Sequence, residues 1–413
     1  MEITTSKRLF KFRLGTNAQS TPDLSTKRVT SIDLLRGAVM AIMAIDHVRD
    51  YFHDAAFLYD PTDLTKTSIP LFLTRFVTHF CAPAFMLLAG TSAYLVGTRK
   101  GKKALSRFLL TRGLWLVFLE LTVINFGWFF DISYSNTGTL VIWALGVSMI
   151  LLSALIYLPK MIILSLSLLM IFGHNLIDTV QVQGQSTGSI IWALLHAPRV
   201  FQFEGVTWFA LYPLIPWIGV MSIGYCLGTL YNENMPIQKR KNLLLQMGVA
   251  AIVLFIVIRF MNSYGDPFSW SSQPRASYTV LSFINLNKYP PSLLYLLVTL
   301  GPCLVFLAIT EKSNGWLSRQ LQVIGRVPMF YYLVHIYLIH LAAMLAAELT
   351  PGINWDAMVL STWVNFDPKL QGYGIGLTAT YAVWFGLMIV LYGMCRWYDQ
   401  YKRSHKHWWL SYL

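Results

Sequence analysis

Apolar segments long enough to cross a lipid bilayer recur along almost the whole chain. A hydrocarbon core about 30 Å thick needs about 20 helical residues. Because lipid offers the backbone no hydrogen-bond partners, each crossing segment has to be a helix. The sequence therefore predicts an all-α, polytopic transmembrane helix bundle of about ten spans, with an eleventh span or a re-entrant segment left open between 182 and 207. The predicted spans are 33–53, 70–97, 106–130, 139–158, 161–180, 208–230, 243–261, 291–310, 327–347 and 375–396.

The distribution of basic residues predicts how these spans are oriented. Only 12% of the 413 residues are charged, and the net charge is +13. The Lys and Arg residues gather in the N-terminal tail and in alternate connections, notably at 99–107, 239–241 and 396–406. This asymmetry places both termini in the cytoplasm by the positive-inside rule. The positive charge is therefore topological, and we expect no nucleic-acid partner.

None of the connections is long enough to hold a separate soluble domain. We predict a basic cytoplasmic tail over residues 1–30, a transmembrane domain over 31–397 and a cytoplasmic C-terminal tail over 398–413. The outside connections are rich in Trp, Tyr, Asn and Asp, a composition that suits a polar, sugar-like acceptor. Interfacial aromatic belts explain the Trp and Tyr equally well.

The first predicted span carries an unusual number of ionisable residues, each of which is expensive in hydrocarbon. Arg36 and His47 are 11 residues apart, which places them within about 20° of one helix face and about 16 Å apart along the axis. Asp50 lies near this stripe, while Asp46, Asp50 and His53 form a second one. In the alternative reading, Asp33 and Arg36 are a capping pair at the membrane surface and His47 is a satisfied buried group.

Other spans carry polar groups at a comparable predicted depth: His79 in the second, Glu120 in the third and His335 in the ninth. Together they predict a buried reaction centre or an ion path, although each one alone is also explained by an interhelical hydrogen bond. A histidine in such a site is a natural general base for a hydroxyl or amine. The spacing of the histidines matches no common metal motif, so we expect no metal site. Covalent acyl-histidine chemistry stays open.

The run SIDLLRG at residues 31–37, followed by IDH at 45–47, resembles the opening of the heparan-alpha-glucosaminide N-acetyltransferase-like family of membrane proteins. The resemblance continues at 71–95, 109–126, 212–228, 287–302 and 325–340, and so covers most of the chain. The Arg-to-His spacing is also similar to that of the wider membrane acyltransferase-3 proteins, in which an Arg and a His of the first span form the functional pair. Arg36 and His47 match those positions.

The resemblance implies transfer of an acetyl or short acyl group from cytosolic acetyl-CoA, across the membrane, to a sugar amine or hydroxyl on the other side. Arg suits the CoA phosphates because it makes bidentate contacts, although positive-inside topology also explains basic residues at this end. The candidate donor-binding residues are Arg36, Asp33, Arg112 and Arg326. The candidate catalytic residues are His47, Asp46, Asp50, His53, His79, Glu120 and His335.

The chain departs from the family at the first span. The family's lysosomal member carries its essential histidine in the first luminal loop and an Asn where this chain has Asp46. His53 is the nearest counterpart, so both His47 and His53 remain candidates for the base. We expect an integral protein of a bacterial inner membrane, with the lipid bilayer, acyl-CoA and an extracytoplasmic glycan as partners, and with homo-oligomers left open.

Two other classes of function compete with the acyltransferase. A proton-coupled transporter would use the buried carboxyl and imidazole groups as a relay. A non-catalytic membrane subunit would present its outer loops to a glycan or to another protein, but it leaves the buried charges unexplained.

Overall fold

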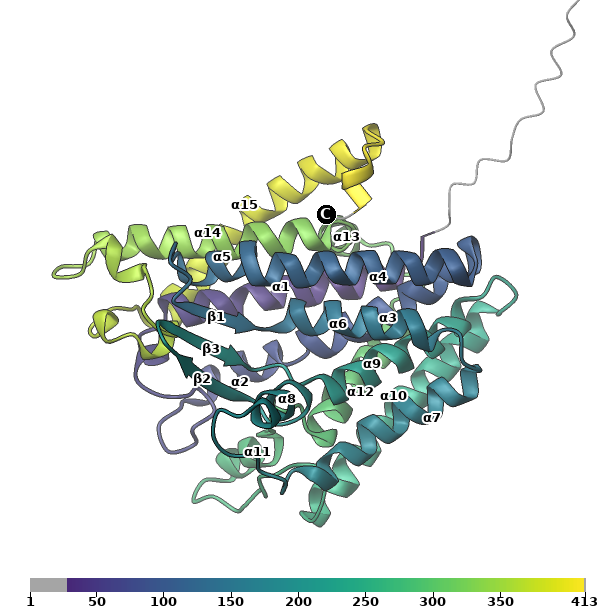
Figure 1. Ribbon diagram of the computed structural model, residues 1–413, viewed down its shortest axis with the longest axis horizontal. Helices are drawn as coiled ribbons and strands as arrows, with labels where there is room; N and C mark the ends of the chain where they lie inside the picture. Colours follow the sequence, from purple (N-terminus) through teal and green to yellow (C-terminus); the bar gives the residue numbers. More distant parts are fainter. Residues whose placement is uncertain (1–27, 412–413) are drawn as a thin grey trace, which may run out of the picture.

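A computed structural model describes residues 28–411, which are mostly helical (Figure 1). Most of the predicted basic tail, residues 1–27, lies outside the described residues. The helices are α1 (Thr30–Phe52), α2 (Ile69–Thr78), α3 (Cys81–Lys100), α4 (Lys102–Leu119), α5 (Asn125–Phe129), α6 (Val141–Leu155), α7 (Lys160–Gly173), α8 (Thr187–Leu195), α9 (Leu214–Leu227), α10 (Ile237–Met261), α11 (Ala276–Ile284), α12 (Leu293–Ile309), α13 (Trp316–Arg326), α14 (Pro328–Glu348) and α15 (Leu377–Ser404). The strands are β1 (Asn136–Thr139), β2 (Arg199–Phe203) and β3 (Val206–Ala210).

Each of the ten predicted spans contains at least one helix. By length and composition, seven helical segments of the described chain are able to cross a membrane, α6 and α12 are shorter apolar helices, and α1 is long but carries the ionisable residues. The protein is therefore an integral membrane protein, while its span count and orientation stay predictions. The seven segments are Ile69–Lys100, Lys102–Phe129, Lys160–Ile177, Leu214–Tyr231, Ile237–Met261, Pro328–Glu348 and Leu377–Ser404.

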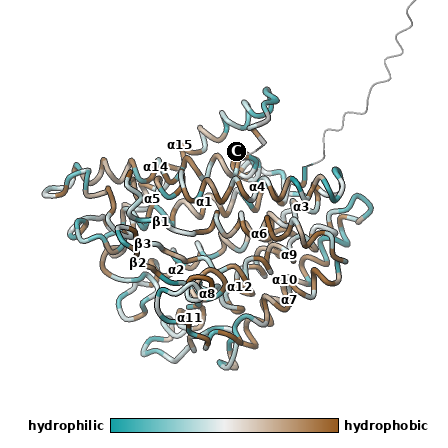
Figure 2. Tube along the Cα trace, in the orientation of Figure 1, coloured by the Kyte–Doolittle hydropathy of each residue, from teal (hydrophilic) through white to brown (hydrophobic). Residues whose placement is uncertain are grey.

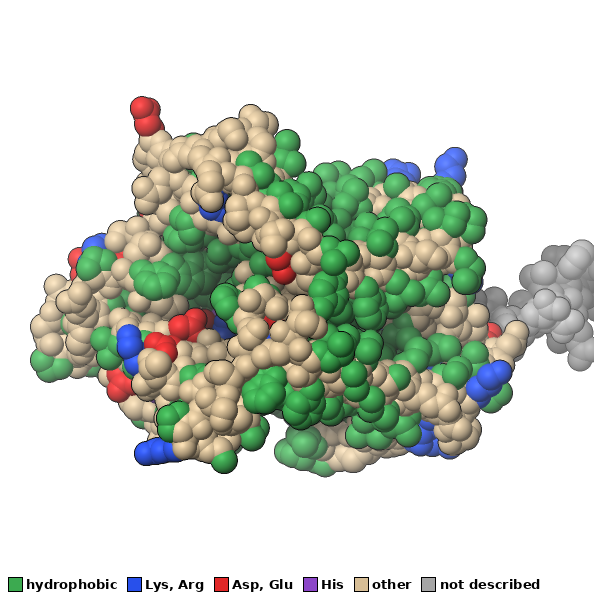
Figure 3. Space-filling model, turned by 90° about the horizontal axis from the view of Figure 1, so that it is seen from below, with side chains coloured by type: hydrophobic (Ala, Val, Ile, Leu, Met, Phe, Trp, Pro, Cys, Tyr) green, Lys and Arg blue, Asp and Glu red, His purple; other side chains and the backbone are tan. Residues whose placement is uncertain are grey.

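The outer surface of the bundle is largely apolar. Hydrophobic residues dominate the helices, whereas the connections at both ends are more hydrophilic (Figure 2). In the space-filling view, hydrophobic side chains cover much of the middle of the molecule (Figure 3). Large apolar side chains such as Val253 on α10 and Phe385 on α15 are more than half exposed. Exposure of this kind is stable only against another apolar medium, which fits a lipid-facing surface.

The prediction of an all-α fold is wrong in one respect, because three short strands form a sheet with the order β1-β3-β2. β3 pairs in parallel with β1 and antiparallel with β2. Each strand has only four or five residues, too few to stand out in a search for spans of about 20 residues. Residues 208–213, predicted to begin a span, are instead the end of β3 and the turn into α9. The segment 182–207 holds α8 and β2, so it is not an eleventh spanning helix.

Two predicted spans contain local breaks in the α-helix. The second is divided into α2 and α3 at His79 and Phe80. The third has a π-helical stretch over Glu120–Ile124, between α4 and α5. Single π turns of this kind are often found at functional sites.

Four pairs of helices with the most extensive mutual contacts cross at glycines. At each crossing, a Cβ atom added to either glycine would come within 2.9 Å of the partner helix. Small residues let helix backbones approach closely, which is how membrane helices gain van der Waals contact without a hydrophobic driving force. The crossings are Gly37 with Gly325 (α1 and α13), Gly90 with Gly224 (α3 and α9), Gly113 with Gly146 (α4 and α6) and Gly248 with Gly301 (α10 and α12).

α1 occupies the centre of the bundle and contacts α2, α3, α12, α13, α14 and α15. This position explains how its charged residues are kept from lipid. The crossing with α13 is especially close, since a Cβ on Gly37 would lie 1.9 Å from the Leu321 carbonyl oxygen, and one on Gly325 would lie 1.9 Å from that of Asp33.

We predict that Gly37→Ala destabilises the protein by about 1–3 kcal/mol, because the new methyl group meets rigid backbone and the two helices must separate. Thermal unfolding of the purified protein in detergent measures this. The matched controls are Gly386→Ala and Gly393→Ala on α15, where a Cβ has open space around it. A Gly37→Ala variant as stable as these controls would show that the crossing is not tightly packed.

Candidate active site

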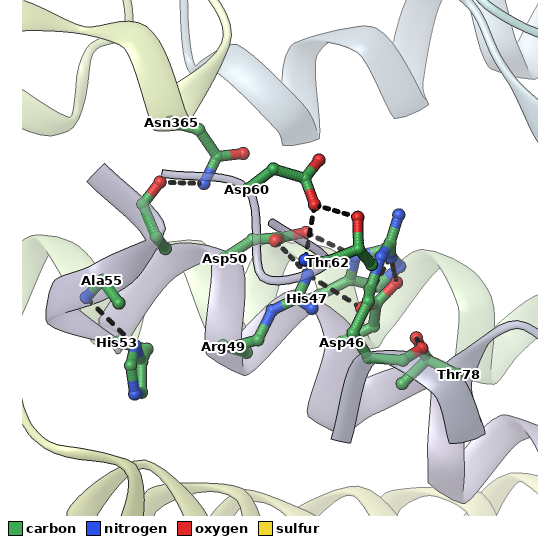
Figure 4. Close-up of polar contacts among 12 residues, drawn as sticks. Asp46, His47, Arg49, Asp50, His53, Ala55, Asp60, Thr62, Thr78 and Asn365 are labelled. Atoms are coloured by element: carbon green, nitrogen blue, oxygen red, sulfur yellow. Dashed lines mark hydrogen bonds and ion pairs between the residues drawn. The ribbon is translucent and has the colours of Figure 1, made fainter. Parts of the chain in front are cut away.

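A buried network of charges surrounds the second half of α1. Asp46 forms an ion pair with Arg49, with 2.9 Å between Oδ1 and Nη2. It also accepts two hydrogen bonds from Arg75 Nη1, at 2.6 and 2.9 Å. Arg49 also pairs with Asp50 at 2.6 Å, and Lys288 Nζ lies 4.0 Å from Asp46. Figure 4 shows Asp46, Arg49 and Asp50 gathered on one side of the helix. Mutual pairing with short, charge-assisted hydrogen bonds allows these charges to stay ionised away from bulk water.

His47 lies next to this network but forms none of its short ion pairs. Its Nδ1 atom is 4.0 Å from Asp50 Oδ2, while Asp46 is directed to the two arginines. The imidazole meets the Trp128 ring edge-on, with 4.7 Å between centroids. His47 Nδ1 is buried and has no hydrogen-bond partner among the described residues. Most buried polar atoms in folded proteins have a hydrogen-bond partner, so this nitrogen is free to accept a proton or a hydrogen bond.

A second imidazole, that of His335 on α14, lies beside His47 with 5.2 Å between the ring centroids. Its Nδ1 atom is 2.5 Å from the Tyr332 carbonyl and 3.2 Å from that of Tyr331. Carbonyl oxygens only accept, so Nδ1 must carry the hydrogen and Nε2 is left as the basic nitrogen. His335 Nε2 is also buried without a partner in the described chain. Two histidines from different helices thus present unused nitrogens in one place.

His47 and the charge network line a cavity of about 470 Å³, which we call the outer cavity. Its volume is in the range of small-molecule sites. Figure 3 shows a hollow at the sheet end of the molecule, with acidic and basic side chains beside it. Burial raises the pKa of the Tyr289 phenol, but the charges of Lys288 and Arg75 outweigh this and lower it below its usual value. The ionisable and aromatic lining residues are Asp46, His47, Arg49, Asp50, His53, Tyr59, Asp60, Arg75, Phe57, Phe85, Trp128, Phe209, Tyr212, Lys288, Tyr289, Tyr332, Trp363 and Phe366.

Two loops are tied together at the rim of this cavity. Asn365 Nδ2 donates to the Ala56 carbonyl at 2.8 Å, and the Ile375 backbone pairs with Phe52 and Asp54 on either side of His53. In Figure 4, His53 lies apart from the Asp46 network, next to Ala55. Its Nδ1 accepts a hydrogen bond from the Ala55 N–H at 3.0 Å. His53 is therefore a rim residue whose ring nitrogen is already engaged.

A second cavity of about 320 Å³, which we call the basic cavity, lies along the first half of α1. Four cations line it: Arg36, Arg112, Arg326 and Lys402. Arg36 donates to Asp33, to the Gly325 carbonyl and to Ser92 Oγ, each at 3.1 Å. Arg326 is held by Asp399 through three contacts of 2.7–3.1 Å. The three arginines predicted as donor-binding residues therefore meet in one place, and Asp33 supports one of them.

The two cavities share part of their walls, because Phe85, Val141 and Tyr332 line both. We call these three residues the junction. It lies between Arg36 and His47, which are about 16 Å apart along α1. His335 is one helical turn from Tyr332, on the side that faces His47. The molecule thus has a cavity lined by charged and imidazole groups and a cationic cavity, which share these three wall residues.

Three of the predicted catalytic residues lie outside both linings: His335, which packs beside His47, and also His79 and Glu120. The His79 ring packs against Tyr295, with 5.3 Å between centroids. Glu120 Oε2 accepts the N–H groups of Ile142 and Trp143, at 2.9 and 3.0 Å. It therefore caps the N-terminus of α6, the same turn that carries Val141 of the junction.

Sequence reasoning missed four residues that complete the site: Arg49, Arg75, Lys288 and Lys402. Arg49 and Arg75 do carry a signal, because each is a charge inside an apolar stretch and Arg49 is at i+3 from Asp46. Lys288 lies in a polar connection and Lys402 in the basic last turn of α15, where nothing local separates them from topological charges.

The fold and site define a polytopic membrane protein with two adjoining cavities and a pair of histidines, His47 and His335, at one of them. Residues 28–260 match the family described as Heparan-alpha-glucosaminide N-acetyltransferase, catalytic. This match spans more than half of the chain, and the chain belongs to that family. Membership implies a membrane acetyltransferase, and enzymes of the family use acetyl-CoA as donor. No curated protein matches the chain. Lys288, Arg326, His335 and Lys402 lie beyond the matched range.

We predict that the buried pair of Asp46 and Arg75 is strongly coupled. Arg75→Ala should cost about 3–5 kcal/mol, because it leaves Asp46 short of a buried partner, and adding Asp46→Asn should restore part of the loss. A double-mutant cycle on unfolding free energies measures this coupling. The exposed pair Asp63 and Lys66, 3.9 Å apart, is the control and should show less than about 1 kcal/mol. Additive effects at Asp46 and Arg75 would contradict the network.

Proposed function

We propose that the protein transfers an acetyl group from acetyl-CoA in the basic cavity to an amine or hydroxyl of a sugar in the outer cavity. The observation that carries this proposal is the shared wall: four cations line one side of the junction and His47 lines the other. Acetyl-CoA fits these two adjoining cavities, because it carries phosphates at one end and a thioester at the other end of a long, flexible chain. Arg36, Arg112 and Arg326 would contact phosphate oxygens, which Arg does in bidentate fashion.

The residues around His47 suggest how the transfer proceeds. His47 accepts the proton of the acceptor amine or hydroxyl as the nucleophile attacks the thioester carbonyl. The new C–N or C–O bond forms, the C–S bond breaks, and the CoA thiolate takes the proton from His47. Asp50, 4.0 Å from His47 Nδ1, stabilises the imidazolium that forms between these events. His335 provides a second basic nitrogen beside the reacting groups.

His47 is the better candidate for the base than His53. The Nδ1 atom of His47 is buried and unpartnered, and the ring lies near the junction, whereas His53 Nδ1 already accepts from Ala55 at the rim. The aromatic side chains of the outer cavity, such as Trp363 and Tyr289, offer flat apolar faces for a sugar ring beside polar groups for its hydroxyls. These features support a sugar as the acceptor class.

The assignment of the donor to the basic cavity and of the acceptor to the outer cavity also implies how the protein is oriented in the membrane. Figure 1 shows the start of α1 and the α3–α4 turn at one end of the molecule, opposite the sheet. The basic cavity lies toward that end, and the connections there carry many of the Lys and Arg residues. We propose that this end is cytoplasmic and that the outer cavity opens on the other side of the membrane.

We predict that His47→Ala lowers the transfer of labelled acetyl from acetyl-CoA to an amino sugar by about 10²–10⁴-fold, since the general base is lost. His53→Ala should retain most of the activity. Acetyl-CoA should still raise the melting temperature of the His47→Ala variant, because the basic cavity is intact.

Normal turnover by His47→Ala would refute the proposed base. If acetyl-CoA gives no thermal shift even in the unmodified protein, and liposomes containing it accumulate a solute with a proton gradient, the proton-coupled transporter is the correct class.

A further inference from the structure

A cluster of possible metal ligands lies at the sheet end of the molecule, outside the linings of both cavities. His174 follows the last turn of α7, Asp178 is four residues further on, and His196 ends α8. One ligand atom from each of these side chains lies within 4.8 Å of those of the other two. His196 Nε2 is already 2.9 Å from Asp178 Oδ1, and the two imidazole centroids are 5.8 Å apart.

The two imidazoles in this cluster are buried but poorly satisfied. The exposed fraction is 2% for His174 and 1% for His196. Both ring nitrogens of His174, and Nδ1 of His196, have no hydrogen-bond partner among the described residues. Buried polar atoms without partners are costly, and a metal ion can take one nitrogen from each of the two rings.

We propose that His174, Asp178 and His196 bind a divalent transition-metal ion, with zinc as the expected occupant. Two imidazoles and a carboxylate are ligands that zinc accepts, at about 2.0–2.2 Å, whereas calcium and magnesium prefer oxygen ligands. The three side chains need to close by about 1 Å to reach these lengths. Asn175 Nδ2 donates to the other Asp178 oxygen at 2.8 Å, which orients the carboxylate toward the histidines.

The position of this site suggests that a bound ion would have a structural role. His196 is three residues before Arg199, the first residue of β2, and both Val200 of β2 and Phe209 of β3 line the outer cavity. Arg199 donates to the Val182 and Gly184 carbonyls, which fixes the loop between α7 and α8. An ion at the cluster would therefore fasten the end of α7 to the hairpin that forms one wall of the outer cavity.

The order of these residues explains why motif searches miss the cluster. His174 and Asp178 are at i and i+4, but the second histidine follows 18 residues later, after a helix and a loop. Common zinc motifs place two histidines within one or two helical turns of each other. Only the folding of α8 back onto the end of α7 brings the third ligand into place.

The test uses the full-length protein in detergent, stripped with a chelator and then titrated with zinc chloride alone. We expect one zinc ion per chain by elemental analysis, a rise in melting temperature of several degrees, and visible absorption bands of a low-symmetry site when cobalt(II) replaces zinc. In His174→Phe, which keeps a ring in the buried position, zinc affinity should fall by more than about tenfold, the lower end of the loss seen when only a supporting residue is removed.

The matched control is the double variant His405→Ala with His407→Ala, which removes two exposed histidines near the C-terminus. It should bind zinc as the unmodified protein does. The proposal is overturned if the stripped protein binds no zinc and shows no cobalt(II) bands. It is also overturned if zinc binds equally to His174→Phe, or is lost in the control variant instead, either of which indicates an adventitious ion only.

Discussion

The pairing of Asp46 with Arg49 and Arg75 is the interaction on which the site depends. A single ionised side chain in hydrocarbon costs about 2.5 kcal/mol or more, so α1 could not lie in the membrane with its charges facing lipid. Arg75 comes from α2 and Lys288 from the segment before α12, and both converge on the same carboxylate. The network therefore places α1 at the centre of the bundle and fixes three segments around His47.

The glycine crossings provide the frame in which this network is possible. Because α1 and α13 touch backbone to backbone at Gly37 and Gly325, Arg36 reaches the Gly325 carbonyl and lies beside Arg326 in the basic cavity. The run SIDLLRG thus combines a cation, its supporting Asp33 and the glycine that lets the next helix approach. One short motif sets both the packing of α1 and the chemistry of its first turns.

The sequence predicted the helices, because they depend on local periodicity, and each of the ten apolar runs contains at least one helix. Arg36 and His47 line two adjoining cavities along α1, while their roles stay predictions. Contacts between residues far apart in the sequence could not be predicted. Nothing local shows that Arg75 and Lys288 share a carboxylate, or that Glu120 caps α6. The cluster of His174, Asp178 and His196 is hidden for the same reason, and the strands are too short for a hydropathy signal.

We propose that donor and acceptor enter from opposite sides of the membrane and meet across the junction of Phe85, Val141 and Tyr332. Sided proteoliposomes test this most directly, with acetyl-CoA supplied to one face, an amino sugar to the other, and protein orientation scored by protease cleavage of the C-terminal segment after α15. We expect acetylated sugar only when acetyl-CoA is on the face of the Arg36 end. Acetylation only when donor and acceptor share one side would contradict it.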